Sequence, residues 1–408
     1  MNGLPLLFSL ATRNLWRNHR RTLVILFAIV LGVWAMIVMA AFMRGISDKM
    51  FYDGIQNLTS HIQIHEKHYL DDPVINNSML VDSTLEETLN SNPKILKWTT
   101  RIRVPAVVSS EQDTAGLTLV GIDPNLEAEM SFLKSAIIEG RYLSGVEDKG
   151  VIIGKKLAEK LETRVGKRIV LMSQDKENQV ADRGFRIVGL FDAETDATEK
   201  SAIFVAINTA KSLLKVEKDI SEIAIEVDDI KNVDRVVEQL KQSLPNYDIK
   251  PWHEIQPLLK MITDLYNSVG IIWHLIVFLA MGFGIVNTLL MAVFERTYEF
   301  GLFQALGLKP AFILIQVWLE AIILLICGLV IGNLASWLTV LATGDGIDMA
   351  NFAEGMQMAG MGNVIPFLIV SEDLITANLV VIVLGLLTGL YPAWRASRLV
   401  PADAITRV

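Results

Sequence analysis

The sequence is short of cysteine and lacks a phosphate-binding loop. Cys327 is its only cysteine among 408 residues, so no disulfide within the chain can stabilise it. No GxxxxGK[ST] motif occurs, and GVIIGKK at 150–156 has the wrong spacing, so the chain does not bind ATP in the P-loop manner. There is no plausible pair of nucleophile and base. A net charge of −8 argues against a surface for nucleic acid.

Charge is also missing from four long stretches, although 20% of the residues are charged and 51% are hydrophobic. Each stretch reaches the roughly 20 residues that a helix needs to cross a bilayer, and only Glu320 interrupts them. The first stretch is too long for the 7–15-residue core of a signal peptide, so we expect it to be retained. We therefore predict four transmembrane helices, at 22–43, 268–294, 311–343 and 374–394.

Lys and Arg are absent between Pro310 and Trp394, whereas they flank the first and last apolar stretches and occur in the 295–310 loop. Because basic residues favour the cytoplasmic side, we expect both termini and this loop to be cytoplasmic. The polar stretch 44–267 and the acidic loop 344–373 then lie outside. Residues 395–408 form a cytoplasmic tail.

The first 21 residues predict an amphipathic helix on the inner surface, with Leu6, Leu10, Asn14 and Arg17 at helical spacing and Trp16 at interfacial depth. A membrane-anchoring flank explains this pattern, and so does a contact to a partner ATPase or a gate.

The stretch 44–267 is long enough for its own core and alternates between helix and strand patterns. We predict an α/β lobe from about 44–95 and 205–262, with an inserted β-rich lobe at about 96–204. The predicted fold class is thus an α-helical membrane bundle of four helices plus a large extracytoplasmic α/β domain. The expected strands are 61–65, 101–109, 117–122, 151–154, 168–172, 185–191, 202–206 and 222–227, and the expected helices are 83–90 (capped by Ser83), 155–161, 208–214 and 231–243.

The segment 295–310 lies between the second and third predicted spans. Its sequence ERTYEFGLFQALG places charges among apolar residues on a helix-compatible frame, which indicates a contact for another protein. With its flanks, GIVNTLLMAVFERTYEFGLFQALGLKPAFI resembles the coupling helix of four-helix ABC permeases, which docks on the ATPase subunit. The resemblance assigns ATPase coupling to Glu295, Arg296, Glu299, Phe300, Gly301, Gln304, Leu306 and Gly307.

The resemblance covers essentially the whole chain. The stretches LTLVGIDPNLEAEMSFLKSAIIEGRYL (117–143) and GLYPAWRASRLVPADAI (389–405) are similar to the lipoprotein-releasing (Lol-type) and MacB-like ABC transporter permeases. It implies a multi-pass protein of the inner membrane with its large domain in the periplasm. It also implies that this transporter subunit is not an enzyme and carries no cofactor, because a dimeric partner ATPase binds ATP and Mg²⁺.

Polar residues inside the predicted spans are few. Glu320 lies about 13 Å in from the start of its helix, and Asn287 and Thr288 about 10 Å deep on the second helix. We expect the three to share hydrogen bonds, with Glu320 neutral and structural, although an intramembrane acid is also a functional candidate. The motifs GxxxG at Gly328 and Gly332 and at Gly385 and Gly389 predict close packing of the third and fourth helices.

Two clusters suggest metal binding but are better explained otherwise. His61 and His65 lie about 13 Å apart if 61–65 is a strand, so with His68 we place them on a solvent-facing strand edge. Met356, Met358 and Met361 suit a pliable apolar surface near lipid. We therefore predict no metal site.

Three functions compete. The first is an ABC permease that extracts or translocates lipoproteins or lipid-like amphiphiles. The second is the same machine exporting peptides or drugs, and the third is a transmembrane signalling or regulatory scaffold. Four helices are too few to enclose a path, so a second permease copy or a sister permease is required. Whether a periplasmic carrier takes part is open.

Overall fold

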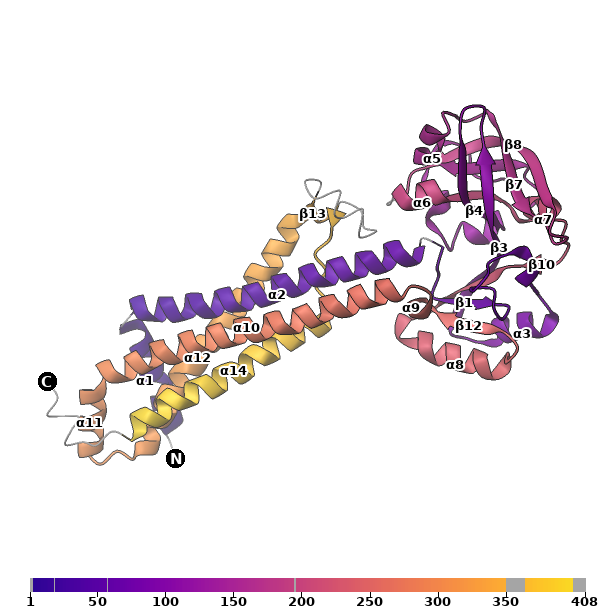
Figure 1. The fold of residues 1–408 in the computed structure, drawn as a ribbon. Helices are drawn as coiled ribbons and strands as arrows, with labels where there is room; N and C mark the ends of the chain where they lie inside the picture. Colours follow the sequence, from indigo (N-terminus) through magenta and orange to yellow (C-terminus); the bar gives the residue numbers. More distant parts are fainter. Residues whose placement is uncertain (1–2, 18, 57, 194–195, 350–363, 399–408) are drawn as a thin grey trace. The chain divides into compact units, whose positions relative to one another are not determined.

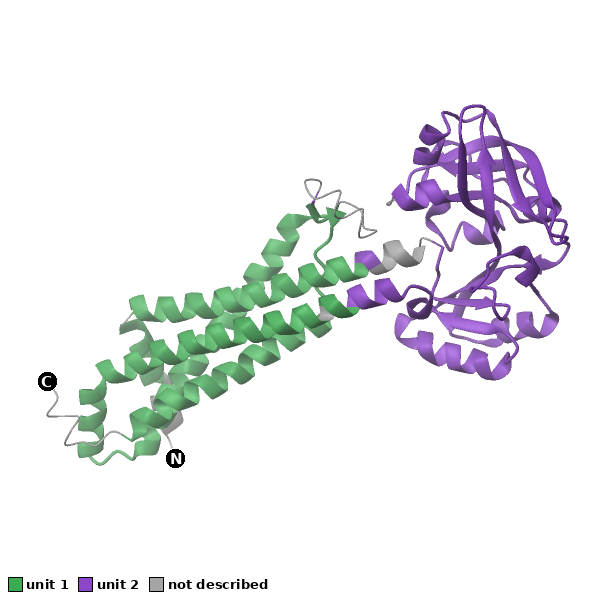
Figure 2. Ribbon diagram, viewed as in Figure 1, with its two compact units in different colours: residues 1–48, 264–348, 364–408 green, residues 49–263, 349–363 purple. Residues whose placement is uncertain are grey.

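The computed structural model describes residues 3–17, 19–56, 58–193, 196–349 and 364–398. The chain divides into two compact units (Figure 2). Unit 1 consists of residues 1–48, 264–348 and 364–408, and unit 2 consists of residues 49–263 and 349–363. The three methionines at 356, 358 and 361 lie outside the described residues.

Unit 1 is a helical bundle (Figure 1). Four of the described helices are long and apolar enough to cross a membrane, which agrees with the four predicted spans. Two of them continue well past their apolar stretches, with 38 residues in the first and 39 in the second. The helices that lie wholly or mainly in unit 1 are α1 (Gly3–Arg17), α2 (His19–Gln56), α10 (Pro257–Glu295), α11 (Thr297–Ala305), α12 (Pro310–Thr343) and α14 (Ser371–Ser397).

The apolar core of unit 1 runs along α2, α10, α12 and α14. Beyond α12, strand β13 (Ile347–Asp348) pairs antiparallel with β14 (Val364–Ile365). The helix α1 packs along α12 and is not an isolated surface helix. Cys327 on α12 is exposed within the chain.

Unit 2 is built on one ten-stranded mixed sheet in the order β12-β1-β11-β3-β4-β9-β6-β8-β5, with β7 paired to β3 and β8. The long strand β3 pairs with β11 over one part and with β4 and β7 over another. The regions predicted as two lobes are therefore hydrogen-bonded into one sheet. The strands are β1 (Ile62–His65), β3 (Ile95–Ser109), β4 (Thr114–Ile122), β5 (Ile137–Gly140), β6 (Gly150–Gly154), β7 (Arg168–Gln174), β8 (Val180–Phe191), β9 (Ala202–Ala206), β11 (Glu222–Val227) and β12 (Asp248–Pro251), with β2 (Met79–Leu80) and β10 (Asp219–Ile220) paired separately.

Short helices cover this sheet and close its core. The helix predicted at 83–90 forms, but Asp82 caps it instead of Ser83, because the Asp82 carboxylate accepts a hydrogen bond from Leu85 N (2.8 Å). The helices of unit 2 are α3 (Ser83–Ser91), α4 (Pro124–Glu127), α5 (Lys155–Lys160), α6 (Asp196–Ser201), α7 (Ile207–Leu214), α8 (Val233–Ser243) and α9 (Trp252–Ile255), with 3-10 turns at Ile75–Asn77, Phe132–Lys134 and Ile230–Asn232.

The expected solvent-facing edge at 61–65 is wrong. Strand β1 lies between β11 and β12, and all four of its residues are buried. His65 is fully buried, with Nδ1 3.2 Å from Ser221 O and Nε2 2.9 Å from Gln63 Oε1. Among the described residues, no three His, Cys, Asp or Glu side chains are placed to hold a metal ion.

Candidate functional site

The short helix α11 has one face turned into the bundle. Phe300 is fully buried and joins an apolar cluster with Val293, Ile313 and Ala393. The guanidinium of Arg296 lies 5.0 Å from the centre of the Phe300 ring. Phe300 thus fixes α11 to the helices on either side of it, and it is not available to a partner protein.

The opposite face of α11 is apolar and open. Tyr298, Leu302 and Leu306 recur at four-residue spacing, which places them on one face, and their exposed fractions are 52%, 42% and 74%. Gln304 is half-buried, and its amide donates to Ser397 O (3.5 Å). The structure therefore divides the eight residues assigned to ATPase coupling: Arg296, Phe300 and Gly301 are buried, Glu299 and Gln304 are half-buried, and Glu295, Leu306 and Gly307 are exposed.

Charged residues gather where α10 ends and α11 begins. The guanidinium of Arg296 donates through Nη1 to both carboxylate oxygens of Glu320, at 3.0 Å each, and through Nε to Glu299 (3.2 Å). The side chains of Arg296 and Glu320 are only 8% and 7% exposed. We call the acids and arginine at this point the α11 charge cluster, together with the α1 and α2 side chains that bind them. Its members are Asn14, Arg17, Arg21, Glu295, Arg296, Glu299 and Glu320.

Glu320 is thus paired with Arg296, and the expected sharing with Asn287 and Thr288 is wrong. Asn287 is exposed, and the Thr288 hydroxyl donates to Gly284 O of its own helix (2.7 Å). Both carboxylate oxygens of Glu320 accept from the Arg296 guanidinium. Arg296 lies just beyond the end of α10, so the apolar pattern of the spans gives no sign of its contact with Glu320.

The helix α1 and the start of α2 complete the α11 charge cluster. Arg17 lies 2.6 Å from Glu299, and Arg21 on α2 lies 2.7 Å from Glu295. The Asn14 amide donates to Glu320 Oε1 (3.0 Å). One continuous series of contacts therefore runs from α1 through α11 to the buried acid of α12.

Small residues bring the long helices together: Gly385 and Gly389 pack against the third helix, as expected, whereas Gly328 and Gly332 pack against the first helix. A Cβ on Gly328 would lie 2.3 Å from Ile29, and one on Gly332 would lie 2.7 Å from Val33, so these two glycines face α2. Gly385 and Gly389 face Leu325 and Ala321 of α12. The third helix therefore uses its glycines against the first helix, and the fourth uses its glycines against the third.

A cavity of about 320 Å³ opens between α2, α10 and α14. Its walls combine apolar side chains such as Met43 and Val380 with an ion pair in which Arg44 donates to both oxygens of Asp373 (2.9 and 2.8 Å). Such a surface suits a molecule with an apolar part and a polar head.

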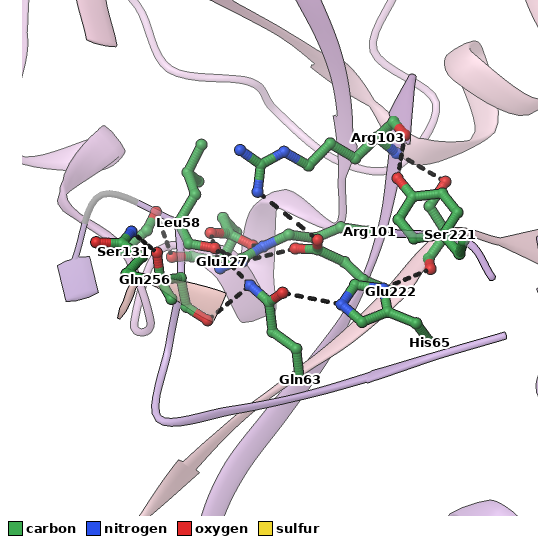
Figure 3. A network of polar contacts seen from close by, with 12 residues as sticks. Leu58, Gln63, His65, Arg101, Arg103, Glu127, Ser131, Ser221, Glu222 and Gln256 are labelled. Carbon is green, nitrogen blue, oxygen red and sulfur yellow. Dashed lines mark hydrogen bonds and ion pairs between the residues drawn. The ribbon is translucent and has the colours of Figure 1, made fainter. Parts of the chain in front are cut away.

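Unit 2 contains a buried polar network that the sequence did not reveal (Figure 3). Its centre is Arg101 of β3, which is paired with Glu127 and Glu222. These partners lie 26 and 121 residues away, and nothing in the sequence of β3 (ILKWTTRIRVPAVVS) identifies them.

The fold and this site define a membrane permease with a large mixed α/β domain. Residues 22–243 match the MacB-like periplasmic core domain, and residues 271–401 match the FtsX-like permease C-terminal domain. The chain belongs to the Lol-type and MacB-like family of ABC transporter permeases.

Named relatives are similar along most of their length. The lipoprotein-releasing system transmembrane protein LolC of Xylella fastidiosa is 24% identical, with 77% of this chain and 78% of LolC covered. The macrolide export ATP-binding/permease protein MacB of Hahella chejuensis is 24% identical over 98% of this chain and 60% of MacB. The solved periplasmic region of MacB from Actinobacillus actinomycetemcomitans is 17% identical, with a TM-score of 0.37, and covers 51% of this chain and 95% of that region.

Proposed function

We propose that this chain is the membrane subunit of an ABC transporter in which α11 docks on a separate ATPase dimer. The observation that carries the proposal is the division of α11 into two faces. Phe300 and Arg296 hold its inner face to the bundle, while Tyr298, Leu302 and Leu306 form an apolar outer face. A helix held in this way can pass a displacement of the ATPase to α10 and α12.

In this proposal the partner ATPase carries out the ATP hydrolysis. The sequence has no P-loop, so ATP and Mg²⁺ are bound by the partner ATPase in this proposal, and this chain has no catalytic residues. Both termini lie in the cytoplasm, unit 2 lies in the periplasm, and a second permease copy or a sister permease completes the transport path.

We further propose that the substrate is a lipoprotein or another lipid-like amphiphile. The cavity between α2, α10 and α14 supports this substrate class, because it offers apolar walls beside the Arg44–Asp373 pair. The similarity to LolC points the same way. Export of peptides or drugs, as the name of the MacB relative suggests, is the alternative, and lipid retained in purified material would separate the two.

The outer face of α11 provides the test. In Leu302→Glu and Tyr298→Glu variants, we expect the bundle to stay folded, because neither side chain is buried. Co-purification of the ATPase and its stimulated hydrolysis should fall at least tenfold, which corresponds to about 1.4 kcal/mol of lost binding. Val180→Glu, an exposed apolar position on β8, is the control. Wild-type affinity for the ATPase in both α11 variants would contradict the proposal.

A further inference from the structure

Arg101 is fully buried in unit 2 together with both of its acidic partners. Its Nε and Nη2 donate to the two oxygens of Glu127 (2.9 and 2.8 Å), and Nη1 donates to Glu222 (3.1 Å). Burial alone would raise the pKa of Glu222, but Arg103 and Arg101 outweigh it and lower that pKa. Burying such charges costs several kcal/mol per ion, and well-packed apolar residues are often as stable. Stability alone is thus a weak reason for this cluster.

The same guanidinium also holds the first described residues after α2. Arg101 Nη1 donates to Leu58 O (2.7 Å), and the Gln63 amide donates to Thr59 O (2.7 Å). Leu58 and Ser60 have φ of 73° and 57°, a left-handed conformation that costs about 1–3 kcal/mol for residues with a side chain. We call residues 58–63 the neck segment. Its backbone is held against its own preference by bonds from the buried network.

The neck segment is also tied to the chain that leaves unit 2. Trp252 N donates to His61 O (3.0 Å), and β1 pairs with β12 from Ile62↔Pro251 onward. The Gln256 amide, one residue before α10, donates to the Thr59 hydroxyl. Figure 3 shows Gln256, Leu58 and Gln63 gathered on one side of Arg101. The two connections to the long helices and the core strands β3 and β11 thus form one bonded assembly.

We infer that Arg101 is a positioning residue for transport, which makes the neck segment move with the sheet of unit 2 as one rigid piece. A movement of α2 is then passed to β3 and β11, whereas a loose neck segment would absorb it. This role rests on the proposed function. The neck segment's rigidity, however, can be measured without any partner.

A single Arg101→Met change would leave two carboxylates buried without a partner and would unfold the domain. The test variant is therefore Arg101→Met/Glu127→Leu/Glu222→Met, which removes all three charges and the guanidinium bond to Leu58 O but leaves the longer bond from the Gln63 amide to that oxygen (3.3 Å). Gln63→Leu is a second variant, which removes the amide bonds to Leu58 O and Thr59 O and the contact with His65, and leaves the ion pairs intact. Arg141→Met is the control, because the Arg141–Asp148 pair (2.5 Å) is formed in the same unit by residues outside the neck segment.

Hydrogen exchange on the full-length protein in lipid nanodiscs gives the first measurement. We expect the amides of 59–63 to exchange at least tenfold faster in the triple variant, since the hydrogen bond from the charged Arg101 to Leu58 O is lost. Gln63→Leu should give a smaller increase, and the β6 and β9 core amides should keep wild-type protection in both variants. Unchanged exchange at 59–63 in both variants would overturn the inference.

The second measurement uses the complex with the ATPase. Both variants should still hydrolyse ATP, but substrate released per ATP should fall, at least tenfold in the triple variant. Faster exchange with wild-type release per ATP would show that the network is merely structural and would also overturn the inference. If the wild-type chain binds no ATPase, the proposed function fails, whereas the exchange measurement still tests the rigidity of the neck segment.

Discussion

At the scale of single residues, the side chain of Arg296 joins α11 to α12. It begins the segment that faces a partner in the proposed mechanism, yet its guanidinium is directed inward to Glu320 and Glu299. Nearly complete burial makes this pair sensitive, because removing one member leaves the other charge without compensation. The intramembrane acid thus has a structural explanation in the described part of the chain.

We predict that Glu320→Leu destabilises unit 1 by about 3–5 kcal/mol, since Arg296 is then buried without a counter-ion. Glu320→Gln should be milder, because its amide oxygen still accepts a hydrogen bond. Thermal unfolding in detergent measures both. The double variant Glu320→Leu/Arg296→Leu should lose less than the sum of the single changes.

Asn287 supplies the control for this double-mutant cycle. It is exposed, whereas Glu320 binds Asn14 and Arg296, so the losses from Glu320→Leu and Asn287→Leu should add. Additivity in the Arg296 cycle would mean that the ion pair does not form.

At the scale of elements, α1 and α11 lie far apart in sequence and are joined by charge. Arg17 of α1 pairs with Glu299 of α11. Arg21 of α2 pairs with Glu295 at the end of α10, and Asn14 of α1 donates to the acid on α12. A single exposed ion pair contributes about 0–1 kcal/mol, but here two pairs and an amide act together. The helix α1 thus helps to position α11.

The ion pair between Arg17 and Glu299 can be tested by swapping the two charges. Arg17→Glu places two acids together and should lower stimulated ATP hydrolysis two- to fivefold, in line with an exposed pair. Arg17→Glu/Glu299→Arg restores opposite charges and should recover most of that loss. Arg13→Glu, an exposed charge on the same helix, controls for the change in net charge. If the swapped pair is no better than Arg17→Glu alone, the contact does not position α11.

Elements were predictable where the signal is local. Missing charge located the four spans, apolar alternation located β4, β7 and β11, and a continuous apolar run located β9, because a strand's own sequence carries such patterns. Partners across long sequence distances were not predictable. Nothing near Arg101 indicates Glu222, and nothing near Gly328 indicates that it faces Ile29 of α2. Such contacts arise only in the tertiary fold, and no local pattern in the sequence indicates them.

At the scale of the whole molecule, the division into two units implies that unit 2 can fold alone. We predict that a fragment of residues 58–256 is soluble, needs no disulfide and unfolds cooperatively. Circular dichroism against temperature tests this. An aggregated or unstructured fragment under mild conditions would show that unit 2 depends on the membrane helices.

The fragment should also lose stability as the pH falls from 7 to 5. Burial lowers the pKa of His65 from its ordinary value of 6.5, so in this range the unfolded chain takes up a proton that the folded chain does not. One such group gives a slope of at most about 1.4 kcal/mol per pH unit. Urea titrations at several pH values should show a shallower slope for His65→Gln. If the slope of stability against pH is equal in His65→Gln and in the wild-type fragment, His65 takes up its proton in the folded state as well, and the prediction fails.

The position of β1 in the sheet also affects how the protein is made. Ile64 pairs with Ile223 and Ile62 pairs with Pro251, so the partners of β1 are synthesised 159 and 189 residues after it. At about 5–20 residues per second, this takes roughly 8–38 s. During that time an apolar strand with unpaired edges leaves the ribosome beside a finished membrane helix. Chaperone dependence during biogenesis is therefore a cost of placing the first strand between two strands that are synthesised much later.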